Sequence, residues 1–200
     1  LICDPLMPAK TLDGRAEDVR ACIACNQACI GHFHKGLPIS CIQHPETGRE
    51  LHYGNLQPTL KRRRIMVVGG GPAGMKAAAV AAQRGHDVTL FEASGQLGGQ
   101  VLLAQLLPRR SEFGGASTNL QREMTLAGVR VLRNTRVDRA LVEQQRPDHV
   151  IIATGAEPYW PAFERGGELQ VVDAWQVLRD QVTLGRSVVV VDWRCDWIGP

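Results

Sequence analysis

The sequence contains few aromatic residues, little net charge and no long apolar run. Aromatic side chains make up 5% of the 200 residues, and 23 basic against 20 acidic residues leave a formal charge of +3. Nucleic acids are usually bound by a strongly basic surface or by aromatic residues that stack on bases, so we expect no nucleic-acid partner. No apolar run approaches the roughly 20 residues of a membrane helix, so we expect no membrane span.

The beginning of the sequence lacks an initiating methionine and the charge pattern of a secretory signal peptide. We therefore expect a cytoplasmic protein. At the other end, residues 187–192 predict a new buried strand, but the sequence stops before any helix that could cover it. Both ends look cut, so we interpret the chain as a fragment of a longer protein.

The region from residue 64 to residue 92 has the pattern of one β-α-β unit. An apolar strand at 65–68 is followed by a glycine-rich loop, an alanine-rich helix and a second strand at 87–92. Further strands are predicted at 129–132 and 149–153. The alternation predicts an α/β fold, namely a Rossmann-like FAD/NAD(P)-binding domain with a parallel sheet, preceded by a cysteine-rich segment.

The loop after the first strand carries the glycine spacing of a dinucleotide site, with Gly69, Gly71 and Gly74. The first glycine permits a tight turn, the second lets the backbone approach a pyrophosphate, and the third permits close contact between helix and strand. Pro72 and Ala73 open the helix, whose unpaired N–H groups favour phosphate. The alternative is a glycine-rich turn that binds nothing.

Glu92 lies 21 residues after Gly71, at the end of the second strand. A carboxylate at this place can accept hydrogen bonds from the ribose hydroxyls of an adenosine. It therefore favours FAD or NAD over a nucleotide that carries a 2′-phosphate.

Two later motifs resemble the FAD-domain signatures of disulfide-reductase-like flavoproteins. The first includes Gly99 and Gln100, and the second ends a strand with Thr154 and Gly155. The residues expected to line an FAD or ADP site are Gly69, Gly71, Pro72, Ala73, Gly74, Glu92, Gly99, Gln100, Thr154 and Gly155.

Four of the six cysteines lie between residues 22 and 41, as Cys22, Cys25, Cys29 and Cys41. Disulfides are not expected beside a nucleotide fold typical of the reducing cytosol. Zinc sites usually combine two close pairs of ligands, whereas here three thiols lie within eight residues and the fourth stands alone. This spacing favours an iron–sulfur cluster, with zinc as the alternative.

The cysteine spacing, a Pro-Glu-Thr-Gly-Arg-Glu stretch at 45–50 and the downstream glycine loop together resemble the multidomain iron–sulfur flavoenzymes. These include 2,4-dienoyl-CoA reductase, trimethylamine dehydrogenase and the N-methyl amino acid demethylases. The resemblance implies that the four cysteines hold a 4Fe-4S cluster, which relays electrons from FMN in a preceding TIM barrel that this chain lacks. Substrate and catalytic residues would lie in that barrel, so we expect a small-molecule substrate and assign no catalytic residue here.

The resemblance also implies a division of the chain. Residues 1–21 would end the barrel, 22–60 would form the cluster segment, 61–185 the FAD or ADP domain, and 186–200 the start of a second nucleotide-binding domain. In the reductase branch that second domain binds NADPH through a glycine loop.

In place of that second glycine loop, this chain has tryptophans and aspartates. The residues at these positions are Val191, Asp192, Trp193, Arg194, Cys195, Asp196 and Trp197. Bulky side chains would obstruct a dinucleotide and carboxylates would repel its pyrophosphate. We therefore expect a flavin-dependent amine or N-methyl amino acid dehydrogenase or demethylase, with an electron-transfer flavoprotein as acceptor and possible homo-oligomers. The alternatives are an NADPH-dependent dienoyl-CoA reductase and, from another class, a zinc-stabilised nucleotide-binding module.

Overall fold

A computed structural model describes residues 1–162, 167 and 169–192 of the chain. The chain divides into two compact units, Leu1–Ala156 and Glu157–Pro200. Each unit is described by itself.

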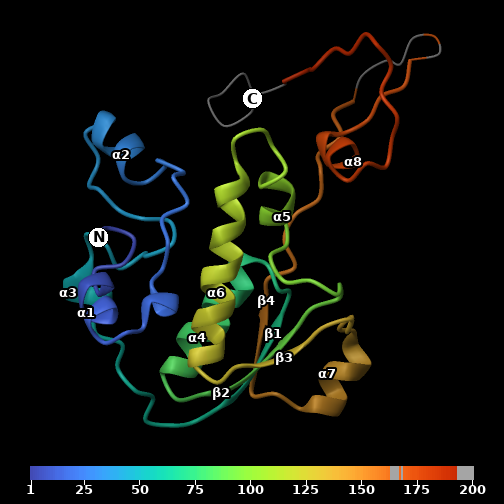
Figure 1. The fold of residues 1–200 in the computed structure, drawn as a ribbon. Coiled ribbons are helices and arrows are strands. Elements are labelled where there is room, and N and C mark those ends of the chain that lie inside the picture. The colour runs from blue at the N-terminus through green and yellow to red at the C-terminus, as the bar shows by residue number, and fades with distance from the viewer. Residues whose placement is uncertain (163–166, 168, 193–200) are drawn as a thin grey trace. The chain divides into compact units, whose positions relative to one another are not determined.

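A parallel sheet of four strands forms the centre of the first unit (Figure 1). The strands are β1 (Arg64–Val68), β2 (Asp87–Phe91), β3 (Arg130–Leu132) and β4 (His149–Ile152), and their order across the sheet is β3-β2-β1-β4. The first strand pairs with both β2 and β4, with Ile65 opposite Val88 on one side and His149 on the other. The predicted Rossmann-like α/β fold is confirmed.

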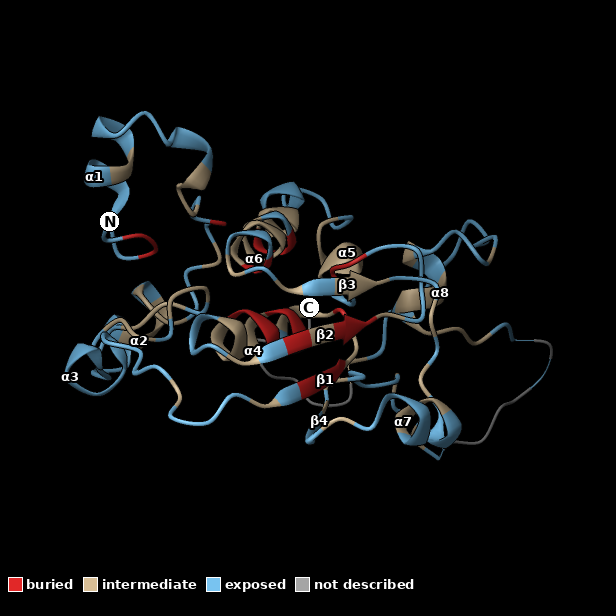
Figure 2. Cartoon of the chain, turned by 90° about the horizontal axis from the view of Figure 1, so that it is seen from below, coloured by how far each residue is buried: buried red, intermediate tan, exposed pale blue. Residues whose placement is uncertain are grey.

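Helices α4 (Pro72–Gln83) and α6 (Gly114–Leu126) pack against each other, and α4 also contacts β1 and β2. Val67, Leu90 and Met75 are fully buried where the helix meets the strands, and Met124 on α6 is 1% exposed. The buried residues therefore concentrate on β1, β2 and the faces of α4 and α6 (Figure 2). The alanines on α4 permit this close approach because they occupy little volume.

Short helical elements connect and flank this core. Within the first unit they are α1 (Met7–Leu12), η1 (Ala16–Asp18), α2 (Ile30–His34), α3 (Glu50–Tyr53), α5 (Val101–Ala104), η2 (Ser111–Phe113) and α7 (Arg139–Gln145). In the second unit, Asp173 caps the N-terminus of α8 (Ala174–Leu178), and its side chain and Gln176 form a capping box. None of the helices in the part of the chain that the structure describes has the length and apolarity that a bilayer crossing requires.

The strand predicted at residues 187–192 is wrong. This stretch is irregular, and Val188, Val189, Val190 and Val191 are 54% to 89% exposed. A buried strand requires neighbours for its hydrogen bonds, and the described residues of the second unit form no strand with which it could pair. Residues 193–197, whose side chains are predicted to obstruct a dinucleotide in the second domain, lie outside the described residues.

Replacing Leu90 by Ala should lower the free energy of unfolding by about 2–5 kcal/mol, because it removes a fully buried side chain from the centre of β2. Chemical denaturation measures this loss. The matched control is Leu126→Ala, because this α6 side chain is 60% exposed and its loss should cost less than about 0.5 kcal/mol. Equal losses in the two variants would contradict the described core.

Candidate cofactor sites

Neighbouring backbone segments lie so close to the glycine loop that side chains on its glycines would not fit. A β-carbon on Gly69 would overlap the carbonyl of Ala153 at the end of β4, and one on Gly74 would overlap the carbonyl of Gly69. Gly69 also has a φ of 110°, which side chains rarely adopt. The first and third glycines of the motif therefore allow β1, α4 and the end of β4 to meet.

The second predicted motif packs directly over this loop. The N–H of Gly98 donates to the carbonyl of Gly70 at 2.9 Å, and a β-carbon on Gly99 would lie 3.0 Å from the Cα of Gly71. Gly98 and Gly99 both have positive φ, at 130° and 54°. Two segments that are almost 30 residues apart in sequence thus form one glycine-lined surface.

Gln100 connects this surface to the third predicted motif. Its Nε2 donates to the carbonyl of Ala156 at 3.1 Å and lies near Gly155, which has a φ of 84°. Thr154 is exposed beside Gly69. The structure therefore brings together the three motifs that the sequence predicted to share a dinucleotide site.

Pro72 and Ala73 form the first turn of α4, and no side chain caps this helix end. The unpaired N–H groups of the first turn and the partial positive charge of the helix end remain available to a phosphate. Since the glycines leave backbone groups uncovered on the same side, the residues fit a bound pyrophosphate.

Glu92 directly follows β2 and points back to the glycine loop. Its Oε2 accepts a hydrogen bond from the N–H of Gly70 at 2.6 Å, and its Oε1 accepts one from the N–H of Ser94 at 2.7 Å. Burial alone would raise the pKa of Glu92, but these two backbone donors outweigh it and lower the pKa from its ordinary value of 4.5. Each oxygen keeps a second lone pair that could accept from a ribose hydroxyl.

The four cysteines of the predicted cluster site are free thiols, of which Cys22 is exposed and the other three are half-buried. Burial raises the pKa of Cys25, a backbone N–H from Gln27 lowers it, and the neighbouring Cys29, Cys41 and Cys22 raise it further. The other three thiols are therefore near enough to Cys25 to influence its pKa.

The thiols are nevertheless not assembled into a finished metal site. Among the described residues, no group of three Cys, His, Asp or Glu side chains is arranged to hold a metal ion. The donor set of four neighbouring thiols fits an iron–sulfur cluster chemically, and the loop would have to draw them together. Their assignment as ligands stays a prediction.

A fifth cysteine, Cys3, also belongs to this region, and no local sequence pattern indicates it. It is 6% exposed, and Gln43, two residues after Cys41, donates from Nε2 to its Sγ at 3.3 Å. Burial, together with Cys41 and Cys22, raises its pKa to about 12, while Arg20 lowers it. Its position beside the motif depends on a contact between residues 40 positions apart.

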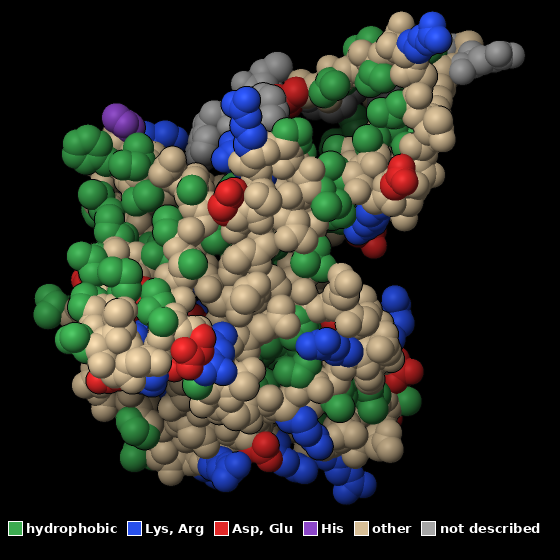
Figure 3. All heavy atoms as spheres, in the orientation of Figure 1, with side chains coloured by type: hydrophobic (Ala, Val, Ile, Leu, Met, Phe, Trp, Pro, Cys, Tyr) green, Lys and Arg blue, Asp and Glu red, His purple; other side chains and the backbone are tan. Residues whose placement is uncertain are grey.

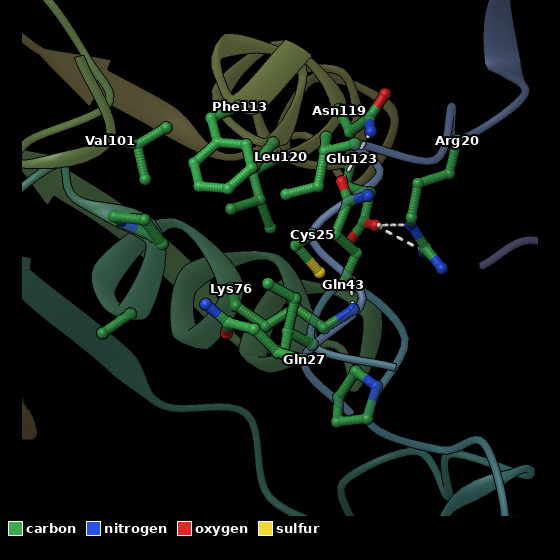
Figure 4. Close-up of a pocket in the computed structure, with 16 residues that line it drawn as sticks. Arg20, Cys25, Gln27, Gln43, Lys76, Val101, Phe113, Asn119, Leu120 and Glu123 are labelled. Carbon is green, nitrogen blue, oxygen red and sulfur yellow. Dashed lines mark hydrogen bonds and ion pairs between the residues drawn. The ribbon is translucent and has the colours of Figure 1, made fainter. Parts of the chain in front are cut away.

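A cavity of about 420 Å³ lies between the cysteine segment and the glycine loop (Figure 4). Its lining includes Cys25 from the segment, Pro72 and Ala73 from the start of α4, and Phe113 and Leu120 near and on α6. The cavity thus adjoins both predicted cofactor sites.

Residues 63–191 match the model of the pyridine nucleotide-disulphide oxidoreductase family. The chain belongs to this family. An oxidoreductase of the flavin-binding type is therefore confirmed as the class of protein.

The chain also matches known proteins along almost its whole length. The chain is 38% identical over 99% of its length to an N,N-dimethylglycine/sarcosine dehydrogenase of Chromohalobacter salexigens, and 38% identical over 96% to an NADH oxidase of Thermoanaerobacter brockii. It matches the structure of a 2-naphthoyl-CoA reductase with a TM-score of 0.85 and 33% identity, over 92% of this chain and 28% of that one. The chain spans about 30% of the length of these two curated relatives. The resemblance to dehydrogenases and reductases of this group is confirmed.

Replacing Glu92 by Ala should weaken binding of FAD or ADP by about 1–3 kcal/mol, because ribose hydrogen bonds would go unpaired. Isothermal titration calorimetry with each nucleotide measures the change. Glu143→Ala is the control, since this carboxylate lies on α7, is 64% exposed and pairs with Arg139. Unchanged affinity in Glu92→Ala would show that the adenosine lies elsewhere.

The lowered pKa of Glu92 also predicts a pH dependence of stability. A carboxyl whose pKa is lower in the folded protein contributes stability above its unfolded pKa, and loses it as pH falls through the folded pKa. The free energy of unfolding of the wild type should therefore fall toward that of Glu92→Gln as the pH drops from about 6 to below about 4. Denaturation at a series of pH values measures this, and a constant difference would contradict it.

Proposed function

We propose that this chain is the electron-relay part of an iron–sulfur flavoprotein that oxidises amines or N-methyl amino acids. The observation that carries the proposal is the cavity that Cys25 shares with the first turn of α4. Cys25, one of the four thiols, lines one part of it, and Pro72 and Ala73, which directly follow Gly71 of the glycine loop, line another. Two cofactor sites so close together suit electron transfer between them.

In this proposal, Cys22, Cys25, Cys29 and Cys41 hold a 4Fe-4S cluster. Gly69, Gly71 and the first turn of α4 bind the pyrophosphate of FAD or ADP, and Glu92 orients its ribose. When bound, a cluster passes single electrons and so couples two carriers that each handle electron pairs. The chain's own residues bind and orient these groups.

An ionic cluster beside the cavity holds Arg20, two residues before Cys22, against the dinucleotide domain. Glu123 on α6 accepts from Nε of Arg20 at 2.8 Å, and its other oxygen lies 3.0 Å from Nζ of Lys76 on α4. All three side chains are mostly buried, at 14% to 23% exposure. A mostly buried carboxylate with two cationic partners holds segments in one geometry better than an exposed pair does.

Residues 1–60 also expose many apolar side chains, which gather around α1, α2 and α3 (Figure 3). Leu12, Phe33 and Leu51 are 88%, 63% and 101% exposed. Such a surface suits a protein partner, and we propose that it packs against a preceding FMN-bearing barrel. That barrel would bind the small-molecule substrate. An electron-transfer flavoprotein would accept the electrons from the enzyme. The enzyme could form homo-oligomers.

The similarity to the dimethylglycine/sarcosine dehydrogenase favours an amine or N-methyl amino acid as substrate. The second candidate is an NAD(P)H-dependent reductase of an unsaturated acyl-CoA, which the match to the 2-naphthoyl-CoA reductase favours. Both of these relatives are redox enzymes, so neither favours a zinc-stabilised module without redox chemistry. The proposed domain limits stay 1–21, 22–60, 61–185 and 186–200.

Purified full-length protein should contain about four iron atoms and four acid-labile sulfides per chain. Replacing Cys25 by Ser should remove most of both, whereas the control Cys3→Ser should keep them. Iron and sulfide analysis of the wild type decides between cluster and zinc. Stoichiometric zinc without sulfide would end the cluster proposal.

The same preparation separates the two candidate activities. We expect anaerobic addition of sarcosine or dimethylglycine to bleach the flavin and NADPH to leave it oxidised. Rapid bleaching by NADPH, with no response to either amine, would favour the reductase instead.

A further inference from the structure

Residues 1–53 contact the dinucleotide domain without adding to its hydrophobic core. Among the described residues, that core is built from side chains of β1, α4, β2 and α6 and from Leu97, and from none of residues 1–53. Ile23 is 5% exposed and packs against the start of α6, where a β-carbon on Gly115 would lie 3.3 Å from its Cγ2. The burial of this side chain stabilises the contact only modestly, so polar interactions have to contribute much of the rest.

Among the residues that the structure describes, three ion pairs connect residues 1–53 to α4 and α6. They are the pairs Arg20 with Glu123, Asp18 with Arg122 and Glu46 with Lys76, and we call them the latch. Nε of Arg122 donates to Asp18 at 2.7 Å, and Glu46 lies 3.9 Å from Nζ of Lys76. Glu123 is the centre of the latch, because Lys76 pairs with it as well.

The latch is partly open to solvent. The side chains of Lys76 and Arg122 are 23% and 41% exposed. Dissolved ions screen the attraction between such charges, whereas they do not screen the burial of apolar surface. The stability of the contact should therefore depend on ionic strength.

The cavity of about 420 Å³ lies inside this contact. Ile23 and Cys25 line it from one side, and Ala73, Ala116 and Leu120 line it from α4 and α6 (Figure 4). Side chains that border a cavity lose the dispersion contacts that close packing would give them. The contact is therefore held less firmly than the packed core is.

Residues 54–63 join the two parts of this contact. They form neither helix nor strand, and most of them are exposed. Polar contacts between parts that are joined by an exposed connection commonly permit relative motion.

We propose that the contact between residues 1–53 and the helices α4 and α6 opens reversibly, and that the latch sets how often it opens. The structure shows the closed form, in which the two candidate sites keep their separation. Opening uncovers Cys25 and the first turn of α4, so ionic strength controls the access of small molecules to both. This inference goes beyond the proposed function and requires neither cofactor.

A thiol in the wall of the cavity tests the opening. Ala116 lies on α6 and is 8% exposed, so the thiol of Ala116→Cys should react with N-ethylmaleimide only when the contact opens. Peptide mass spectrometry of the full-length protein gives the labelling rate at this position. Two further variants are references: Ala79→Cys, 0% exposed in the core, reports global unfolding, and Leu126→Cys, 60% exposed on the same helix, gives the rate of an open thiol.

Raising the NaCl concentration from about 0.02 M to about 0.5 M should increase labelling at position 116 at least about threefold, because screening weakens the latch. At the lower salt concentration, adding Glu123→Gln should increase it about tenfold, because two cationic partners lose their charged acceptor. Labelling at positions 79 and 126 should stay unchanged. The matched control Glu143→Gln, which removes an exposed ion pair on α7, should leave the rate at position 116 unchanged.

Equal labelling at position 116 at both salt concentrations and with Glu123→Gln would overturn the proposal. A parallel rise at position 79 would overturn it as well, because the whole domain would then unfold rather than the contact open. The proposal would also be wrong if, at low salt, Ala116→Cys reacted as fast as Leu126→Cys, since the contact would then not be closed.

Discussion

The close approach of backbone segments around the glycine loop is the constraint on which the dinucleotide site depends. Side chains at Gly69 or Gly74 would occupy the space of neighbouring carbonyls, and a side chain at Gly99 would press on Gly71. These contacts let the end of β1, the start of α4, the end of β4 and the loop before α5 share one surface. The uncovered N–H groups and the carboxylate of Glu92 are placed by this packing.

A different kind of interaction orders residues 1–21, which lead into the cysteine segment and have little regular structure beyond the short elements α1 and η1. Asp4 is 4% exposed and accepts from Nζ of Lys10 at 2.7 Å and from the N–H groups of Arg20 and Leu6. Burial alone would raise its pKa, but Lys10 and the backbone donors lower it. Asp18 in turn accepts from Arg122 on α6 at 2.7 Å. Buried and half-buried polar contacts thus replace hydrophobic periodicity in holding this segment.

The two systems meet on α6, whose contacts depend on the side of the helix. Met124 packs into the core, Ser117 reaches the glycine surface, and Asn119 and Glu123 reach the cysteine segment. A helix that is bonded to both sites keeps the distance between them nearly constant. In the proposed electron relay, such rigidity favours transfer because the two cofactors keep a fixed separation.

The sequence by itself determined the parallel α/β fold, the family and the three glycine-containing motifs of the candidate dinucleotide site, because strand periodicity and glycine spacing are local signals. It failed at residues 187–192, where an apolar run predicts a strand whatever neighbours exist; the structure leaves the valines exposed. It also could not place Cys3 beside Cys41, or join Gln43 to Asn119 across 76 positions. Only the tertiary structure decided these contacts, because they depend on which surfaces the folded chain brings within hydrogen-bonding distance.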